Sequence, residues 1–185
     1  MSDKFLRRSL LYVPGSSQKM ISKAQTITAD AVIFDLEDAV SISEKDQARD
    51  NVTRALSEMK NSGKEIIVRI NAMDTLWGYK DIMAIASLYP DAIILPKANE
   101  NSLITADMML GAMEKELGAE LYTIKLIPLF ETTYSIANAY QVLGATPRID
   151  GVQLGAEDLT KEQEITRTTS GAEILYARQQ LAMAA

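Results

Sequence analysis

The chain has 185 residues, of which 47% are hydrophobic and 24% are charged, a composition typical of a globular domain with one core. It contains no histidine and no cysteine, which excludes imidazole catalysis, thiolate nucleophiles, disulfides and zinc sites built from these residues. The formal net charge of −6 argues against a nucleic-acid partner. The N-terminus lacks an apolar signal core and no apolar run is long enough to span a bilayer, so we expect a cytoplasmic protein without a membrane partner.

Six short apolar runs predict buried parallel strands, because each is uniformly apolar and not alternating. They are Leu10–Val13, Ala31–Leu36, Ile66–Ile70, Ala92–Leu95, Leu126–Phe130 and Val152–Leu154. Helical patterns occur at about Ser17–Thr28, Ser43–Met59, Trp77–Leu88, Ser102–Leu117, Thr132–Leu143 and Gly171–Ala184. The clearest of them, Ser43–Met59, follows a capping-box pattern formed by Ser41 and Glu44. This alternation predicts an α/β fold with a parallel sheet, either a barrel or an open doubly wound sheet.

Polar residues at the carboxyl ends of the predicted strands favour the barrel. In a (β/α) barrel all strand ends converge on one site, whereas in an open sheet the polar residues concentrate at the switch point. The strands are followed by Pro14-Gly15-Ser16, by Asp35, Glu37 and Asp38, by Arg69 and Asn71, by Lys97, by Glu131, and by Glu157 and Asp158. Pro14-Gly15-Ser16-Ser17 has a single glycine, so it is not a dinucleotide fingerprint.

We therefore predict that residues 1–185 form a single, truncated domain of the TIM-type (β/α) barrel class. A complete barrel has eight strand–helix units and about 250 residues, and this chain supplies about six units. Two interpretations follow. Either the chain is part of a longer protein, or it is naturally short and another chain covers its first and sixth strands, as in a homo-oligomer.

The first two strand ends carry different candidate chemistry. Backbone N–H groups at Gly15 could hold a phosphate, with Arg7 and Arg8 nearby, although an ordinary strand-to-helix turn is the favoured interpretation. Three acids, Asp35, Glu37 and Asp38, follow the second strand. Acids placed at the end of a buried strand lose solvation and repel one another, so they predict a cation, a ligand or a paired base.

The third and fourth strand ends carry basic residues. Arg69 lies inside the apolar run Val68–Asn71, where a guanidinium needs a partner. A structural pair with the acids of the second strand and a clamp for a substrate carboxylate are both consistent with this position. Lys97 invites a Schiff-base interpretation, but acidic surroundings stabilise the ammonium form, so we favour an exposed or ion-paired lysine.

Glu131 and Asp158 follow the fifth and sixth strands. Neighbouring strands lie roughly 5 Å apart, so these two carboxylates could share an octahedral Mg²⁺ and leave positions for water and substrate oxygens. The alternative is helix capping, because Glu131 precedes a predicted helix and acids are favoured at helix N-termini.

Six segments in the chain resemble motifs of the citrate lyase β-subunit family, which belongs to the HpcH/HpaI aldolase group and includes malyl-CoA and citramalyl-CoA lyases. They occur in the order of the family and cover nearly the whole chain. The segments are Leu6-Arg-Arg-Ser-Leu-Leu-Tyr-Val-Pro-Gly15, Phe34-Asp-Leu-Glu-Asp-Ala-Val40, Val68-Arg-Ile-Asn71, Leu95-Pro-Lys97, Ile127-Pro-Leu-Phe-Glu131 and Leu154-Gly-Ala-Glu-Asp-Leu159.

The resemblance implies a Mg²⁺-dependent barrel enzyme that cleaves a carbon–carbon bond in a 3-hydroxyacyl thioester. For citryl-CoA or citryl-acyl-carrier protein, the products are oxaloacetate and the acetyl thioester. By this resemblance Glu131 and Asp158 bind the metal, and Arg69 acts with Glu37 and Asp38 as catalytic residues. Candidates for binding the substrate or its thioester carrier are Arg8, Pro14, Gly15, Arg69, Asn71 and Lys97.

Three alternatives remain open at this point. Members of the family usually continue with two more strand–helix units and a C-terminal lid, which this sequence lacks. The chain could therefore be a malyl- or citramalyl-CoA lyase, a thioesterase of the same group, or a non-catalytic assembly protein that keeps the metal pocket. The resemblance also implies partners, either copies of the same chain or other lyase subunits.

Overall fold

The computed structural model describes residues 6–60 and 62–185. Most of the N-terminal residues on which the absence of a signal segment was judged, Met1–Phe5, lie outside these ranges. All six predicted strands are present within a residue or two of their expected bounds. They are β1 (Leu10–Pro14), β2 (Ala31–Asp35), β3 (Glu65–Arg69), β4 (Ala92–Leu95), β5 (Lys125–Phe130) and β6 (Gln153–Leu154).

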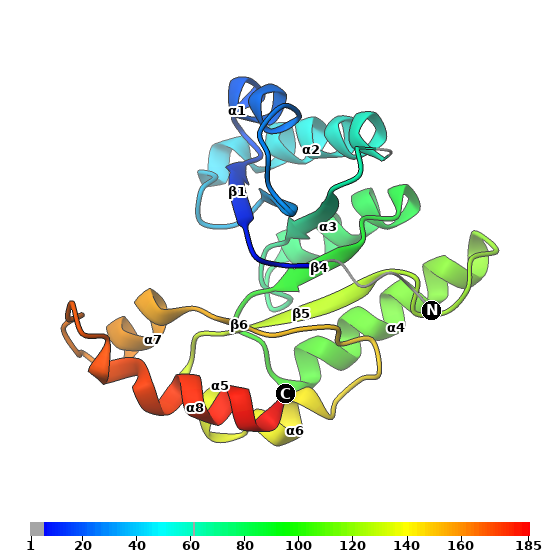
Figure 1. The fold of residues 1–185 in the computed structure, drawn as a ribbon. Coiled ribbons are helices and arrows are strands. Elements are labelled where there is room, and N and C mark those ends of the chain that lie inside the picture. Colours follow the sequence, from blue (N-terminus) through cyan, green and yellow to red (C-terminus); the bar gives the residue numbers. More distant parts are fainter. Residues whose placement is uncertain (1–5, 61) are drawn as a thin grey trace.

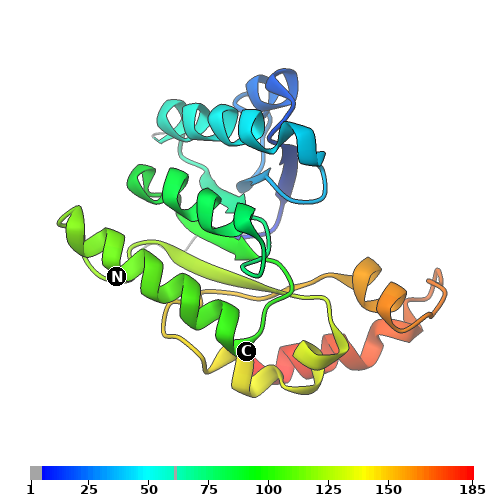
Figure 2. The same cartoon turned by 180° about the vertical axis from the view of Figure 1, so that it is seen from behind.

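The strands form one curved parallel sheet in the order β1-β2-β3-β4-β5-β6, so each strand pairs with the next strand in the sequence. This order has no switch point, which excludes the open doubly wound alternative and confirms the incomplete barrel. Most helices lie along the outer, convex side of the sheet, whereas the short helix Ala156–Glu162 lies beyond the end of β6. Figures 1 and 2 show this arrangement from opposite directions.

Alternating side chains of each strand enter two separate cores. The larger core joins the sheet to the helices and contains residues such as Val32, Val68 and Leu126. The smaller core fills the inner face, with Tyr12 packed against it: Ala31, Ile33, Ile67, Ala92, Ile94, Ile127 and Leu129. Because side chains alternate along a strand, residues two positions beyond this inner row face the barrel mouth. Asp35, Arg69 and Glu131 occupy such positions.

The α-helices are α1 (Gln18–Ala24), α2 (Lys45–Met59), α3 (Leu76–Ile85), α4 (Glu100–Glu116), α5 (Thr133–Ala137), α6 (Ala139–Leu143), α7 (Ala156–Glu162) and α8 (Leu175–Ala184). Short 3₁₀ turns, Ile42–Glu44, Ala86–Leu88 and Ala172–Ile174, precede α2, follow α3 and precede α8. In the described ranges, no helix combines the length and apolarity needed to cross a membrane.

Two helix predictions need correction. The helix expected at Thr132–Leu143 is divided at Asn138, whose backbone has φ −109° and ψ 28° and is not helical. Its side chain bonds the carbonyl of Tyr134, a local competition that asparagine often introduces in helices. The capping box predicted at Ser41 does not form either. Its hydroxyl donates to the Glu44 carboxylate, and no side chain caps the 3₁₀ turn.

The barrel is open between β1 and β6. In the described part of the chain these two strands do not pair with each other, and side chains link them across the gap. The Tyr12 hydroxyl on β1 donates to Gln153 Oε1 on β6 at 3.0 Å. Near the amino ends of the strands, Arg7 bonds the carboxylates of Glu65 and Asp150 at 2.6 and 2.8 Å.

Candidate active site

Glu131 directly follows β5 and is held in place by backbone atoms of two neighbouring loops. Its Oε1 accepts the Lys97 N–H at 2.7 Å, and its side chain is almost entirely buried. On the other side lies Gly155, where an added Cβ would come within 2.6 Å of the Glu131 Cβ. Gly155 therefore gives Glu131 the space to lie against the end of β6. The first helix after β5 is capped by Thr132 and not by Glu131.

Asp158 lies beside Glu131 and is supplied by α7, a helix that the sequence did not predict. Asp158 is in the first turn of α7, where an acid is favoured by the helix dipole. Glu131 and Asp158 both line a cavity of about 350 Å³, together with Lys97, Thr132, Lys161 and Glu162. The predicted pair is thus brought to one cavity by two adjacent strand ends.

The electrostatics of this pair favour a bound cation. Burial raises the pKa of Glu131 to about 7, with the Asp158 charge adding to the rise and the Lys97 N–H opposing it. In the described ranges, no group of three acidic side chains is close enough to hold a metal by itself. A hard cation that accepts two carboxylate oxygens and keeps water ligands, such as Mg²⁺, fits this donor set.

Arg69 and Asp35 form the second part of the site. Asp35 is fully buried, and its two oxygens accept bonds from Arg69 Nε and Nη2 at 2.7 and 2.5 Å. The same oxygens accept the N–H groups of Glu37 and Ala39. Asp35 therefore anchors both the guanidinium and the turn that follows β2. The partner that the sequence required for Arg69 is an acid of the second strand.

Glu37 is buried, and its carboxylate faces Arg69 without a hydrogen bond to it. Its Oε2 lies 3.3 Å from Arg69 Nη1 but makes no hydrogen bond to any described residue. Burial raises the pKa of Glu37 to about 8; Arg69 opposes the rise and Asp38 adds to it. Arg69 is the main group that opposes the rise, and burial outweighs it while the guanidinium is hydrogen-bonded to Asp35. The carboxyl is neutral below that pH and ready to accept or donate a proton near it.

A larger cavity of about 470 Å³ joins these two parts, and residues from five strands and the turns after them line it. They include Asp35, Asp38, Arg69, Glu131 and Asp158, together with Tyr12 and Gln153. Glu37 is not in this lining and lies behind it, next to Arg69. The Arg69 guanidinium lies over the Tyr12 ring, 5.1 Å from its centre. Tyr12 and Gln153 are site residues that the sequence did not predict. The only sequence feature that could have indicated them is that each places a polar group inside a short apolar run.

Other predicted residues are placed differently. Arg8 lies near the amino ends of the strands, away from the mouth. Its exposed side chain pairs there with Asp30 at 2.7 Å. Asn71 is buried behind the site and donates to Leu36 O at 2.9 Å and to Asp81 Oδ2 at 2.7 Å. Of these two residues, neither lines the described cavities at the mouth.

Pro14 and Gly15 lie at the mouth edge, and packing explains the glycine. An added Cβ at Gly15 would be 2.9 Å from Val52 Cγ2 and 3.0 Å from the Asp35 carbonyl. The Gly15 carbonyl also accepts a bond from Asn51 of α2 at 3.1 Å. These contacts join β1, β2 and α2 closely, so the ordinary turn is sufficient to explain the segment.

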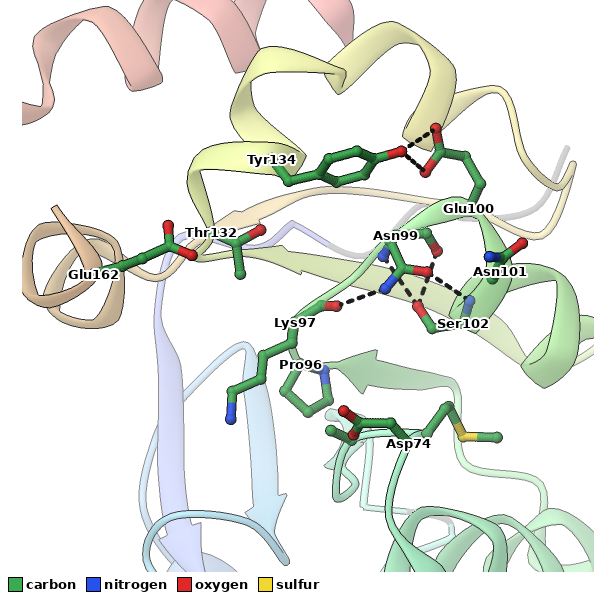
Figure 3. Close-up of a pocket in the computed structure, with 12 residues that line it drawn as sticks. Asp74, Pro96, Lys97, Asn99, Glu100, Asn101, Ser102, Thr132, Tyr134 and Glu162 are labelled. Atoms are coloured by element: carbon green, nitrogen blue, oxygen red, sulfur yellow. Dashed lines mark hydrogen bonds between the residues drawn. The ribbon is translucent and has the colours of Figure 1, made fainter.

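Lys97 contributes through its backbone as well as its side chain. It has φ +48°, a left-handed conformation that is unusual for a residue with a side chain. In Figure 3 its side chain points away from the hydrogen-bonded turn of Asn99 and Ser102. That turn, Tyr134 and Glu100 border a further cavity of about 470 Å³ that continues the mouth past Lys97 and Thr132.

Comparisons with known proteins agree with this architecture. The family model "HpcH/HpaI aldolase/citrate lyase" matches residues 8–185. The chain is 36% identical to the citrate lyase subunit beta of Leuconostoc mesenteroides subsp. cremoris over 179 residues, which cover 96% of this chain and 59% of that protein. It is 40% identical to a (3S)-malyl-CoA thioesterase of Cereibacter sphaeroides over 157 residues, covering 84% of this chain and 50% of that protein.

A solved structure of the citrate lyase beta subunit from M. tuberculosis, in complex with oxaloacetate and magnesium, has a similar fold. The TM-score is 0.73 at 26% sequence identity, and the match covers 98% of this chain and 76% of that one. The chain thus spans about 59% of the length of the Leuconostoc relative.

Proposed function

The chain belongs to the HpcH/HpaI aldolase/citrate lyase family, and from this premise we propose that it acts in Mg²⁺-dependent cleavage of a carbon–carbon bond in a 3-hydroxyacyl thioester. The favoured substrate is a citryl thioester, of coenzyme A or an acyl-carrier protein, which gives oxaloacetate and an acetyl thioester. The observation that carries the proposal is the pair Glu131 and Asp158 in one cavity, with burial raising the pKa of Glu131 to about 7.

Glu131 and Asp158 are the residues that we propose hold the metal. Bound Mg²⁺ would polarise the substrate hydroxyl and the neighbouring carboxylate, which makes the hydroxyl more acidic. Arg69 lines the same cavity as the pair and remains charged, because its contacts with Asp35 and Glu37 raise its pKa despite burial. Its guanidinium would hold a substrate carboxylate or carbonyl oxygen through charge-assisted hydrogen bonds.

Glu37 is the proposed proton carrier, and Asp38 adds negative charge beside it. The substrate hydroxyl gives its proton to the Glu37 carboxylate as the carbon–carbon bond breaks. The electron pair of that bond passes to the thioester, and the resulting enolate takes up a proton to become the acetyl thioester. At neutral pH only the ionised minority of this carboxyl, whose pKa is about 8, accepts the hydroxyl proton, and the protonated form that results donates a proton to the enolate.

The test is production of oxaloacetate from citryl-CoA, measured with and without Mg²⁺ on the 185-residue chain. Glu131→Gln and Asp158→Asn should each lower the rate by at least about 100-fold and weaken Mg²⁺ binding measured by calorimetry. Arg8→Gln is the matched control, because Arg8 lies at the opposite edge of the sheet and should leave both values unchanged. A raised KM in Arg8→Gln would show that Arg8 takes part in binding the thioester substrate. Mg²⁺ binding without turnover would refute the lyase proposal and favour a non-catalytic role.

A malyl thioester is the second candidate, supported by the 40% identity to a (3S)-malyl-CoA thioesterase. Rates with citryl-, malyl- and citramalyl-CoA would rank the substrates. The products would separate the reactions, since a lyase releases an oxoacid and the acetyl thioester, whereas a thioesterase releases free coenzyme A and the intact hydroxyacid.

A further inference from the structure

Lys45 is a buried lysine close to the candidate site, and neither the resemblance nor the strand-end pattern singled it out. It is the first residue of α2 and is 6% exposed. Its ammonium donates to the main-chain carbonyls of Leu36 and Glu37, at 2.7 Å in each case. The ring of Trp77 lies 6.0 Å from the same nitrogen.

This is an unfavourable place for a cation. The amino end of a helix carries partial positive charge, so a lysine there gains nothing from the helix dipole. Burial also lowers the pKa of Lys45, with the nearby carboxylates of Asp81, Asp35, Glu37 and Asp38 opposing that change. A charge that loses solvation in this way is retained only if its hydrogen bonds compensate. For Lys45 those bonds are to the two carbonyls.

The two carbonyls belong to the turn that carries Glu37. Asp35 holds this turn through the N–H groups of Glu37 and Ala39. Lys45 holds the same turn through the carbonyls of Leu36 and Glu37. The Glu37 carbonyl also closes the turn by accepting the Val40 N–H at 3.1 Å. The turn is thus hydrogen-bonded through both its amide and its carbonyl groups, and Asn71 adds a second bond to the Leu36 carbonyl.

We propose that Lys45 is a positioning residue for Glu37, which it acts on by fixing the carbonyls of Leu36 and Glu37. This inference rests on the proposed function, in which Glu37 carries the proton. A lysine with a purely structural role would affect the stability of the fold and not the chemical step.

The test is Lys45→Met, which keeps the aliphatic stem and removes the ammonium. We expect kcat to fall about 10- to 100-fold through misplacement of Glu37, with KM and Mg²⁺ affinity close to their wild-type values. Lys64→Met is the matched control, because Lys64 also donates to main-chain carbonyls, those of Gln25 and Ala24, far from the mouth. Lys64→Met should lower stability without changing kcat.

A double variant separates positioning from general destabilisation. If Lys45 acts through Glu37, adding Lys45→Met to Glu37→Gln should cause no further loss of kcat. Losses that multiply in the double variant, or a kcat in Lys45→Met no lower than in Lys64→Met, would overturn the proposal. Lys45→Leu, which also lacks a donor, replaces Lys45→Met with the same expected result if that variant does not fold.

Amide hydrogen exchange tests the proposal without any turnover. In Lys45→Met the N–H groups of Glu37, Ala39 and Val40 should exchange faster, while those of β3 keep their wild-type protection. If the wild-type chain cleaves no thioester, the proposed function fails. The amide hydrogen exchange rates then test by themselves whether Lys45 positions the turn of Glu37. Unchanged exchange at these three amides would then refute the inference.

Discussion

Three acids within four residues of the β2 end occupy three different environments. Asp35 is buried and accepts hydrogen bonds from Arg69 and the turn, Glu37 is buried with its Oε2 lacking a hydrogen-bond partner among the described residues, and the Asp38 side chain is 64% exposed. The sequence shows only a cluster of negative charge, which predicts a cation, a ligand or a paired base. The structure places a guanidinium against that cluster and leaves the pair Glu131 and Asp158 as the candidate metal ligands.

The raised pKa of Glu37 predicts a pH-dependent stability. The folded chain keeps this proton up to a pH of about 8, whereas the unfolded chain releases it near the ordinary value of 4.5. Stability of the wild-type chain is therefore lost as pH rises through this window, by at most ~1.4 kcal/mol per pH unit for one group. Glu37→Gln should become progressively more stable than wild type from pH 5 to 8 in urea unfolding. A difference that is constant with pH would contradict the raised pKa.

Lys97 allows its backbone and side-chain roles to be separated. Glycine accepts the left-handed conformation, so Lys97→Gly should be more stable than Lys97→Ala by about 1 kcal/mol. Both variants keep the N–H that bonds Glu131 and lose the ammonium. An equal rise in KM in both would assign substrate binding to the ammonium, and unchanged KM in both would restrict Lys97 to its backbone contact.

At the residue scale, the sequence predicted which charged residues lie near the strand ends, but not the direction in which each side chain points. Glu131, Asp158 and Arg69 could be placed at the mouth, because strand ends converge in a parallel barrel. Arg8 lies near the amino ends of the strands because it precedes β1. This placement could also have been predicted from the sequence. Tyr12 and Lys45 could not be identified, because their roles depend on the inward direction of one strand and on carbonyls of a neighbouring turn.

Among the elements, the strands were the most predictable and the short helices the least. Uniformly apolar runs are strong signals, and all six matched. Helix α7 has only seven residues and follows a two-residue strand, so its pattern is too short to distinguish from a loop. It nevertheless supplies Asp158. Half of the candidate metal site therefore depends on the element with the weakest signal.

Two glycines predict opposite effects of the same substitution in helices. At Gly78 in α3 an added Cβ would be 2.5 Å from the Ala72 carbonyl, whereas at Gly111 in α4 the nearest atom is 3.7 Å away. Gly78→Ala should destabilise the fold by about 1–3 kcal/mol through overpacking. Gly111→Ala should stabilise it by roughly 0.5–1 kcal/mol through lower chain entropy. Thermal unfolding checks both, and equal effects would show that α3 shifts to make room.

For the whole molecule, the open side of the barrel depends on a few long-range polar contacts. Arg7 joins Glu65 on β3 to Asp150 before β6, and Glu65 is 1% exposed. The sequence indicated how many strands there are. It could not show these contacts, since the partners of Arg7 are 58 and 143 residues away.

Removal of this contact should be costly. Arg7→Met leaves Glu65 buried without its partner and should lower the free energy of unfolding by about 3 kcal/mol or more. Arg8→Met is the neighbouring control, and its exposed pair with Asp30 should contribute little. Urea unfolding of the two variants tests the difference. Similar small losses in both would mean that the gap between β1 and β6 is held by packing alone.

The sequential strand order also bears on how the chain acquires its fold during synthesis. Each strand finds its hydrogen-bonding partner in the strand made just before it, so no pairing has to wait for a distant segment. Pairings between nearby segments lose less loop-closure entropy and form faster. A nascent chain can therefore add one strand and its covering helix at a time as it leaves the ribosome. The newest strand is always the growing edge, and the residues of the mouth are brought together only as the last strands join.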